Sequence, residues 1–510
     1  MKISVGTTQL RPVHVFAIGG LILALAAFII RGRSASRSNN QPAAPQLSPS
    51  CHLILTPLSG DTPIDNEISQ LQRRVLNGSK TVPDFERLAW TFVRKARSTF
   101  DPGYYKLAEQ CAVCIDSIKS QTAEALLLRA HVAQNLHRFS EAEALASQLT
   151  KLRERSFDYG VLGDALIDQG KIREGAAAYQ KMVDLRPDLQ SYVRAAQVRW
   201  LTGDLKGAIQ LMQLAVSSSS PNDPNTGAWA FNRLALYQLQ LGVIQQAMHS
   251  CDAALSLQAD YAPAVLTKAR ILLAKKRTDE ALVQFKRAAD LNPLPEYQWA
   301  LADVMHMTDS VGANEVEAQI NQSSEDPRTV SLYLATRGDD PERALQLAEQ
   351  EIKNRQDVFT HDALAWALAA SVRTKEARTE VDKALAEGTK DARLYLHAGL
   401  ITAQVGDYNQ ARRFLEQAQA IQQMLFPSER LLLQTWRKQI RGSSPTARRR
   451  ALTDNLKGSN QLSQGVNFQN EHTVKTKTGC GHRSVGCDAY CSDAGDWIRF
   501  KSHGCTSHRA

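Results

Sequence analysis

The chain has 510 residues, of which 43% are hydrophobic and 22% are charged, so most of it can bury a core. Its formal charge of +9 suggests a nucleic-acid or anionic-membrane partner. This charge lies at the two ends, however, because residues 1–50 carry +5 and residues 427–510 carry +8. Residues 51–426 hold 42 basic and 46 acidic side chains and are therefore slightly acidic. Eight cysteines in this length exclude a disulfide scaffold for the body of the protein.

A short segment, residues 1–12, precedes an uncharged apolar run of 18 residues at 13–30. As a helix this run would span about 27 Å, enough for the hydrocarbon core of a membrane. We expect an uncleaved, single-pass signal anchor. One alternative is a cleavable signal peptide, although the small-x-small site at Ala24-Leu25-Ala26 lies inside the run. The other is a buried core helix, but no neighbouring sequence has this character. Basic residues flank both ends, so the charge rule leaves open which side of the membrane the body occupies.

The next segment, residues 31–64, contains five prolines and many serines and asparagines. This composition predicts an extended linker between the membrane and the body. Cys51 falls within it and is expected to be a free cysteine.

Residues 65–426 have the periodicity of helices, and the pattern repeats along the chain. Its clearest unit starts at Tyr159, continues with Leu162-Gly163, and carries a small residue, Gly175, on its second helix before Pro187. The small second-helix residue recurs in five more units, with two steps of 34 residues, at Ala208, Ala247, Ala281, Ala377 and Ala411. Small residues let two helices approach closely, and proline ends each unit.

This unit resembles the tetratricopeptide repeat (TPR), and the resemblance covers about ten units at 84–118, 123–155, 156–350 (six units) and 358–424. It implies an all-α fold, a right-handed α-solenoid. Residues 300–325 diverge most and are a predicted break in it. The resemblance also implies that the first helices line a concave groove that holds a peptide or a helix of a partner protein.

Positions 2, 5, 9, 12 and 13 of a unit would face this groove. The candidate partner-binding residues are Gln197, Trp200, Asn232, Arg270 and Trp366. For each there is a structural alternative: the tryptophans can pack between helices, and Arg270 and Asn232 can lie on a solvated face. The Lys/Asn pattern with which chaperone-binding relatives hold a terminal carboxylate is not present as such.

Cys111 and Cys114 stand on one face of a predicted helix and are expected to be reduced core thiols. Residues 427–441 predict an amphipathic helix that caps the last unit, with four large apolar side chains facing inward: Leu431, Leu432, Leu433 and Trp436.

The basic tail, residues 442–510, is predicted to be flexible and largely disordered. It contains Cys480, Cys487, Cys491 and Cys505. These could bind zinc, or form two disulfides if the tail lies outside the cytoplasm, or do neither. Only the spacing of Cys487 and Cys491 suits a structural zinc site well.

The sequence contains no phosphate-binding glycine loop, no H-E-x-x-H and no G-x-S-x-G motif, so catalysis is not expected. No cofactor is expected except zinc in the tail. The predicted function is a membrane-anchored scaffold that binds a protein or peptide through the concave face of the solenoid. The alternative is a TPR adaptor with a zinc or thiol-redox module in its tail. Nucleic acid is not an expected partner.

Overall fold

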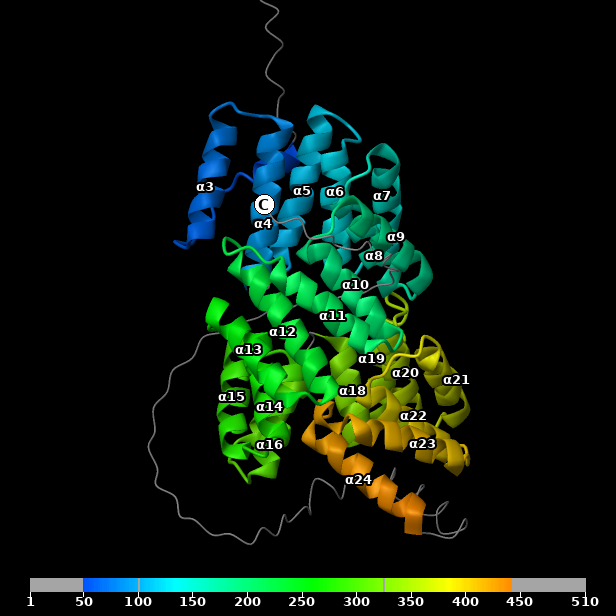
Figure 1. The fold of residues 1–510 in the computed structure, drawn as a ribbon. Helices are drawn as coiled ribbons and strands as arrows, with labels where there is room; N and C mark the ends of the chain where they lie inside the picture. Colours follow the sequence, from blue (N-terminus) through cyan, green and yellow to red (C-terminus); the bar gives the residue numbers. More distant parts are fainter. Residues whose placement is uncertain (1–48, 100, 324–325, 443–510) are drawn as a thin grey trace, which may run out of the picture. The chain divides into compact units, whose positions relative to one another are not determined.

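The computed structural model describes residues 49–99, 101–323 and 326–442, and these belong to one compact unit that begins at Pro49. The described residues form 23 α-helices and one 3-10 helix, with no strand among them (Figure 1). The helices before the repeats are α2 (Pro49–Leu53) and α3 (Pro63–Leu76). Those after them are the 3-10 helix η1 (Gln422–Met424) and α24 (Pro427–Gly442).

Ten helix pairs lie between Val82 and Ala420, in the region where about ten units were predicted. Their first helices are α4 (Val82–Thr99), α6 (Ala123–Asn135), α8 (Ser156–Asp168), α10 (Leu189–Leu201), α12 (Pro224–Leu241), α14 (Ala262–Ala274), α16 (Pro295–Met307), α18 (Pro327–Arg337), α20 (Val358–Ala370) and α22 (Ala392–Gln404). Their second helices are α5 (Gly103–Ile118), α7 (Phe139–Leu152), α9 (Ile172–Leu185), α11 (Leu205–Ser217), α13 (Ile244–Leu257), α15 (Thr278–Leu291), α17 (Ala313–Gln322), α19 (Pro341–Glu351), α21 (Thr374–Leu385) and α23 (Tyr408–Ala420).

Small residues bring the two helices of a pair into contact, as the repeat pattern predicted. A methyl group at Gly163 would lie 2.4 Å from the Tyr179 ring, and one at Gly175 would lie 2.7 Å from the Ile167 side chain. Neither position can hold a larger residue unless the helices move apart.

Polar side chains fix where many of the helices begin. In each case a side-chain oxygen just before the helix accepts a hydrogen bond from a free N–H of the first turn. The capping residues are Thr62, Thr122, Asp188, Asp204, Asp223, Asp326, Asp340, Asp357, Asp391 and Asp407.

Val372, in the turn between α20 and α21, is strained. Its φ is +61° and its side chain is exposed, whereas several other pairs place a glycine with positive φ at this turn, as at Gly203 and Gly406. The left-handed conformation costs a residue with a Cβ about 1–2 kcal/mol. We therefore expect Val372→Gly to stabilise the protein by about 1 kcal/mol, which would be measured as a higher midpoint of denaturant-induced unfolding. Val372→Ala, which keeps the Cβ, is the control; an equal gain from both variants would contradict this explanation.

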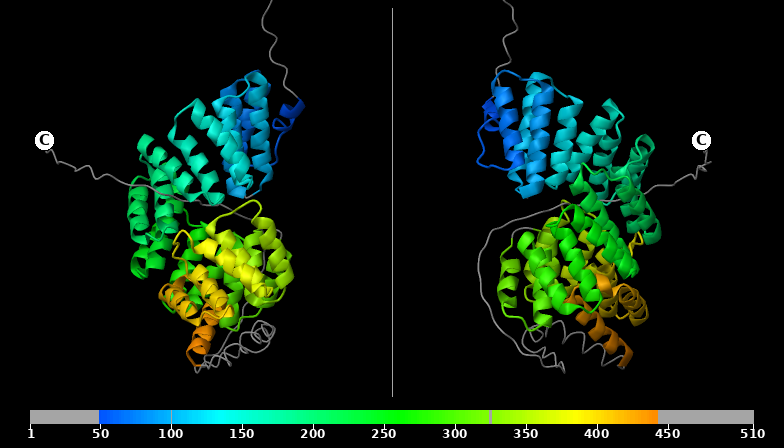
Figure 2. Two further views of the ribbon diagram at one scale, coloured as in Figure 1. Left: turned by 90° about the vertical axis from the view of Figure 1, so that its right-hand side faces the viewer. Right: turned by 60° about the vertical axis from the view of Figure 1, so that its left-hand side comes forward.

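Segments far apart in the sequence contact each other at the ends of the first helices α8, α10 and α12. The Gln356 N–H donates to the Asp168 carbonyl (2.9 Å), and the Thr389 hydroxyl donates to the Leu201 carbonyl (2.5 Å). The Gln423 side chain donates to the carbonyls of Leu239 and Gln240, at 3.0 Å each. The later helices therefore lie beside α8–α12, as two further views also show (Figure 2).

Helix α24 and η1 lie against the first helices of the later pairs: α24 contacts α16 and α22, and η1 contacts α12, α14 and α22. The Ser428 N–H and hydroxyl both donate to Asp303 of α16, at 2.8 and 2.5 Å. Phe426 packs edge-on against Trp299, with the ring centroids 5.1 Å apart. The two helices that follow the repeats thus lie against the first helices α12, α14, α16 and α22.

Helix α24 has two of its four predicted inward residues, Leu433 and Trp436, buried, while Leu431 and Leu432 are half-buried. The described part of residues 300–325 contains the end of α16 and a short α17, so a helix pair is present at the predicted break.

Two predictions about cysteines are wrong. Cys51 lies in α2 rather than in an extended linker, and it is bonded to Cys114 of α5. Cys114 is therefore not a reduced thiol, although Cys111 is one. The segment at 31–64 also contains α2 and the start of α3 in its described part.

Candidate partner-binding face

The first helices of successive pairs contact one another directly, as α4 does with α6 and α6 with α8. From α4 to α10 these first helices form a layer, and the second helices pack against them. The free side of this layer is where a solenoid of this kind presents side chains to a partner. We call this side of α4, α6 and α8 the inner face.

Three aromatic side chains meet on the inner face: Trp90 of α4, His131 of α6 and Phe157 of α8. The Trp90 and His131 ring centroids are 5.1 Å apart, Trp90 and Phe157 6.2 Å apart, and His131 and Phe157 6.0 Å apart. Trp90 and Phe157 are half-buried, whereas His131 is buried. In this aromatic cluster, Trp90 and Phe157 therefore expose part of their apolar rings to solvent, and the buried His131 ring lies beneath them.

His131 is held as a neutral ring. Burial is the main cause that lowers its pKa well below the usual value, and the cations Arg97 and Arg194 add to the effect. Its Nε2 lies 2.9 Å from an Arg97 guanidinium nitrogen, so this nitrogen accepts the hydrogen bond and the proton is on Nδ1. The cluster keeps its apolar character at neutral pH as a result.

Charged groups of both signs surround the aromatic cluster. Burial and the neighbouring Glu124 carboxylate raise the pKa of Glu86. Arg153 bonds Glu124 at 3.1 Å and Asp158 at 2.8 Å. On the α8–α10 side, the Arg194 guanidinium holds the Asp164 carboxylate with two hydrogen bonds, of 2.7 and 2.6 Å. An apolar centre with a polar rim is the arrangement found at protein interfaces.

The five groove residues predicted from the sequence are all buried or half-buried within the chain. Trp200 stacks on Phe359 of α20, with centroids 5.4 Å apart, and its N–H donates to Gln240 (2.8 Å). Trp366 stacks on His397 (4.4 Å), and its N–H donates to Thr336 (3.0 Å).

The other three lie in similar surroundings. Arg270 bonds Glu296 at 2.7 Å, and its guanidinium carbon stands 4.8 Å from the centre of the Phe426 ring. Gln197 and Asn232 are 4% and 5% exposed. Trp366, Gln197 and Asn232 therefore offer little surface to a partner, whereas Trp200 and Arg270 are half-buried.

Trp90, His131 and Phe157 were not selected from the sequence, although the repeat register marked each of them. Phe157 stands six residues before Gly163 and is therefore at position 2, one of the positions expected to face the groove. Trp90 follows Ala89 as His131 follows Ala130, which is position 9 after the small residue at position 8. The first two units deviate from the repeat pattern, so this register was not recognised.

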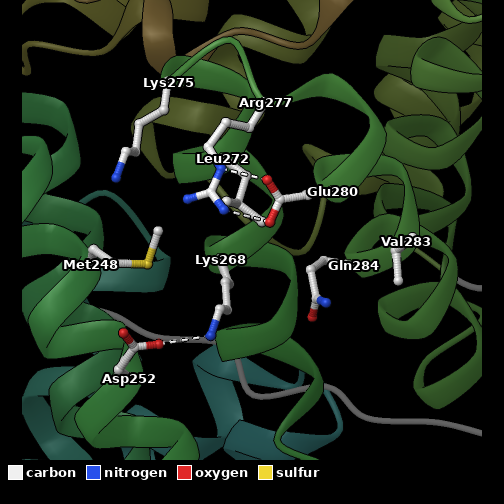
Figure 3. A pocket seen from close by; sticks show the side chains of 9 residues that line it. All are labelled: Met248, Asp252, Lys268, Leu272, Lys275, Arg277, Glu280, Val283 and Gln284. Carbon is white, nitrogen blue, oxygen red and sulfur yellow. Dashed lines mark hydrogen bonds and ion pairs between the residues drawn. The ribbon is translucent and has the colours of Figure 1, made fainter.

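A separate hollow of about 470 Å³ lies between α13, α14 and α15 (Figure 3). Lys268 pairs with Asp252 at 2.8 Å, and Arg277 pairs with Glu280. Two of the three cations that line it are thus neutralised, and Met248 and Leu272 add an apolar wall. The hollow has no marked preference for a charged ligand.

In the part of the chain that the structure describes, no group of three or more His, Cys, Asp or Glu side chains could hold a metal ion. The zinc candidates Cys480, Cys487, Cys491 and Cys505 lie outside the described residues. So do residues 1–12, the apolar run at 13–30 and the tail beyond Gly442. Of the helices in residues 49–442 that are described, none combines the length and apolar character needed to cross a bilayer.

Comparison with known proteins identifies the repeat. Residues 161–224 and 392–423 each match a family model of the tetratricopeptide repeat. The chain therefore contains TPR units, and these are generally units of protein-interaction scaffolds. A search of curated proteins found no match.

Solved structures of helical-repeat proteins are similar to the chain at low identity. A tetratricopeptide repeat protein from Parabacteroides merdae is 17% identical over 48% of this chain and 97% of its own, with a TM-score of 0.28. Human IFIT1, solved as a dimer with PPP-AAAA, is 14% identical over 69% of this chain and 76% of its own, with a TM-score of 0.36. A chain of the APC/C hetero-tetramer Cut9–Hcn1 is 12% identical over 73% and 96%, with a TM-score of 0.28. Because these TM-scores are below 0.5, the ligands of these proteins are not inferred to be ligands of this chain.

Proposed function

We propose that the protein is a scaffold that binds a protein partner on the inner face of α4, α6 and α8. The aromatic cluster of Trp90, His131 and Phe157 is the observation that carries this proposal. The partner supplies an apolar side chain that packs on Trp90 and Phe157, and its polar flanks meet the charged rim. Aromatic residues at the centre of an interface commonly supply most of the binding free energy.

In this proposal the five residues predicted from the sequence stabilise the fold rather than contact the partner. Trp200 of α10 lies outside the inner face and packs on Tyr237 of α12 and Phe359 of α20, and Gln197 of the same helix is buried. Arg270, Asn232 and Trp366 support the later pairs from within. Their substitution is expected to reduce stability before it reduces binding.

The partner can be found by placing a photo-crosslinking amino acid at Trp90 in the full chain and identifying the protein captured. The same residue at Leu214, an exposed position on the second helix α11, is the matched control. A partner that crosslinks from Trp90 and not from Leu214 fits the proposal. Equal capture from both positions would contradict it.

With that partner in hand, Trp90→Ala and Phe157→Ala are each expected to weaken binding by about 30-fold, the effect of losing about 2 kcal/mol at an interface hot spot. Both side chains are half-buried, so circular dichroism must first establish that the fold is kept. Leu214→Ala is expected to bind like the wild type. Unchanged affinity of a folded Trp90→Ala variant would exclude the inner face as the binding surface.

We also propose that residues 13–30 anchor the scaffold in a membrane as a single-pass segment. The support is the uncharged run of 18 residues, followed by a proline-rich segment that reaches the first helices. The full chain is expected to stay with the membrane fraction after an alkaline carbonate wash. Two arginines in place of Leu21 and Leu23 should release it, because each charge at the centre of a membrane helix costs about 3 kcal/mol. Release of the wild type by carbonate would refute the anchor.

A further inference from the structure

The Cys51–Cys114 disulfide joins the start of the described chain to the second helix of the first pair. The two Cα atoms are 5.7 Å apart and 63 residues separate them in sequence. Both residues are buried, with no exposed surface. The bond fixes α2 on α5 and encloses α3 and α4 in a covalent loop.

Hydrogen bonds hold the same segment in place independently of the sulfur atoms. The Gln72 side-chain amide of α3 donates to the Ile54 carbonyl (2.8 Å) and to the Thr56 carbonyl (2.9 Å). Gln72 is itself buried, so these are the bonds of a packed interior. The fold therefore positions Cys51 against Cys114, and the pairing does not depend on a chance encounter of loose segments.

The other two cysteines of the described chain are reduced, and their burial makes them unreactive. Cys111 and Cys251 are both completely buried. Burial raises the pKa of the Cys111 thiol well above its usual value and that of Cys251 to about 12. A thiol attacks a disulfide only as a thiolate. Cys111, one helical turn before Cys114, is thus a poor nucleophile, and the arrangement suits a permanent bond rather than an exchanging one.

Buried structural disulfides form and persist in oxidising compartments and are rare where glutathione and thioredoxin keep thiols reduced. We infer that the solenoid folds on the oxidising, non-cytoplasmic side of a membrane and that Cys51–Cys114 is its structural disulfide. In forming it, the two thiols together lose two protons and two electrons. A small-molecule or protein disulfide of that compartment accepts them and is cleaved to two thiols.

This inference goes beyond the proposed binding function, because it assigns the compartment in which the inner face meets its partner. It does not depend on the aromatic cluster, so the two can fail separately. Together with the proposed anchor at residues 13–30, it implies an orientation with the solenoid on the non-cytoplasmic side.

The test uses the full chain in its native host. Cells are quenched in acid, free thiols are alkylated during unfolding, and the protein is digested without reductant. We expect the peptides that contain Cys51 and Cys114 to be recovered as one disulfide-linked species, and the Cys111 residue to be alkylated. Cys114→Ala should abolish the linked species and expose Cys51 to the alkylating reagent, whereas Cys111→Ala, the matched control, should leave the link intact.

A second readout is a phosphatase reporter that needs its own disulfides, fused after Ala510 of the full chain. It should be active in the wild-type protein. It should also be active in Cys114→Ala at equal protein level, because this variant changes the bond and not the compartment. Alkylation of both Cys51 and Cys114 in the wild type, or an inactive reporter, would overturn the inference.

Discussion

Replacing Glu429 with alanine is expected to destabilise the docking of α24 by about 2–3 kcal/mol, because it removes the charge-assisted hydrogen bonds that this buried carboxylate makes with the half-buried Arg393 guanidinium. Glu429 is completely buried and bonds Arg393 of α22, and one of its oxygens also accepts the Phe426 N–H at 2.8 Å. Burial alone would raise the pKa of Glu429, but Arg393 and the Phe426 N–H keep it below the usual value.

The pH dependence of this contribution has a definite sign. Since the folded pKa is lowered, the stability from the pair is present above the pKa of an unfolded glutamate, about 4.3. It is lost as the pH falls through the lower folded value. At neutral pH the full effect of Glu429→Ala should therefore be observed.

Hydrogen exchange of the segment 427–442 measures this loss locally, which suits a repeat protein whose parts can open separately. The exposed ion pair of Arg277 and Glu280 supplies the matched control, and Glu280→Ala should cost no more than about 1 kcal/mol. If Glu429→Ala lowered the local stability of α24 no more than Glu280→Ala lowers that of α15, the ion pair of Glu429 and Arg393 would not stabilise the docking of α24.

The second large effect is expected from the disulfide. A covalent loop of this size lowers the entropy of the unfolded chain, so removing the bond with the double variant Cys51→Ala/Cys114→Ala should cost about 4 kcal/mol. The change should appear as a lower unfolding temperature of the segment that contains α2 to α5. Cys111→Ala removes a buried sulfur one turn away without opening the loop, and its cost should be clearly smaller. Equal costs for the two variants would mean that the bond adds little stability.

The repeat architecture is readable in the sequence because it rests on local features. Gly163 and Gly175 stand where two helices of a pair touch, and their spacing reports a contact made within one unit. The same holds for the second-helix alanines, of which Ala208, Ala247 and Ala281 are all completely buried. A pattern that recurs every 34 residues is therefore visible without knowledge of the three-dimensional structure.

Contacts between distant units leave no such periodic trace. Trp200 meets Phe359 across 159 residues, and Thr389 bonds Leu201 across 188. The repeat register marks Trp200 as a first-helix residue of the predicted groove, but only the three-dimensional structure shows that Phe359 stacks on it. The pairing of Cys51 with Cys114 is of the same kind, because α2 precedes the repeats and has no counterpart in them.

The inner face could be predicted in part. Trp90 and His131 occupy the same repeat position, so their proximity follows from the stacking of α4 on α6 once the register of the first units is known. Phe157 stands six residues before Gly163, at position 2 of the clearest unit, and so also occupies a position expected to face the groove. Its contact with Trp90 could not be predicted, because it depends on the offset between successive pairs.

The central claim is that the first-helix layer is open to a partner at α4–α8 and covered by the chain itself in the later pairs. Hydroxyl-radical footprinting of the full chain, read by mass spectrometry, tests it most directly, because tryptophan and phenylalanine oxidise in proportion to their contact with solvent. We expect Trp90 and Phe157 to oxidise several-fold faster than Trp366 and Trp299, which are 4% and 0% exposed. Oxidation of Trp366 and Trp299 as fast as Trp90 would contradict the claim and return the binding face to the later pairs.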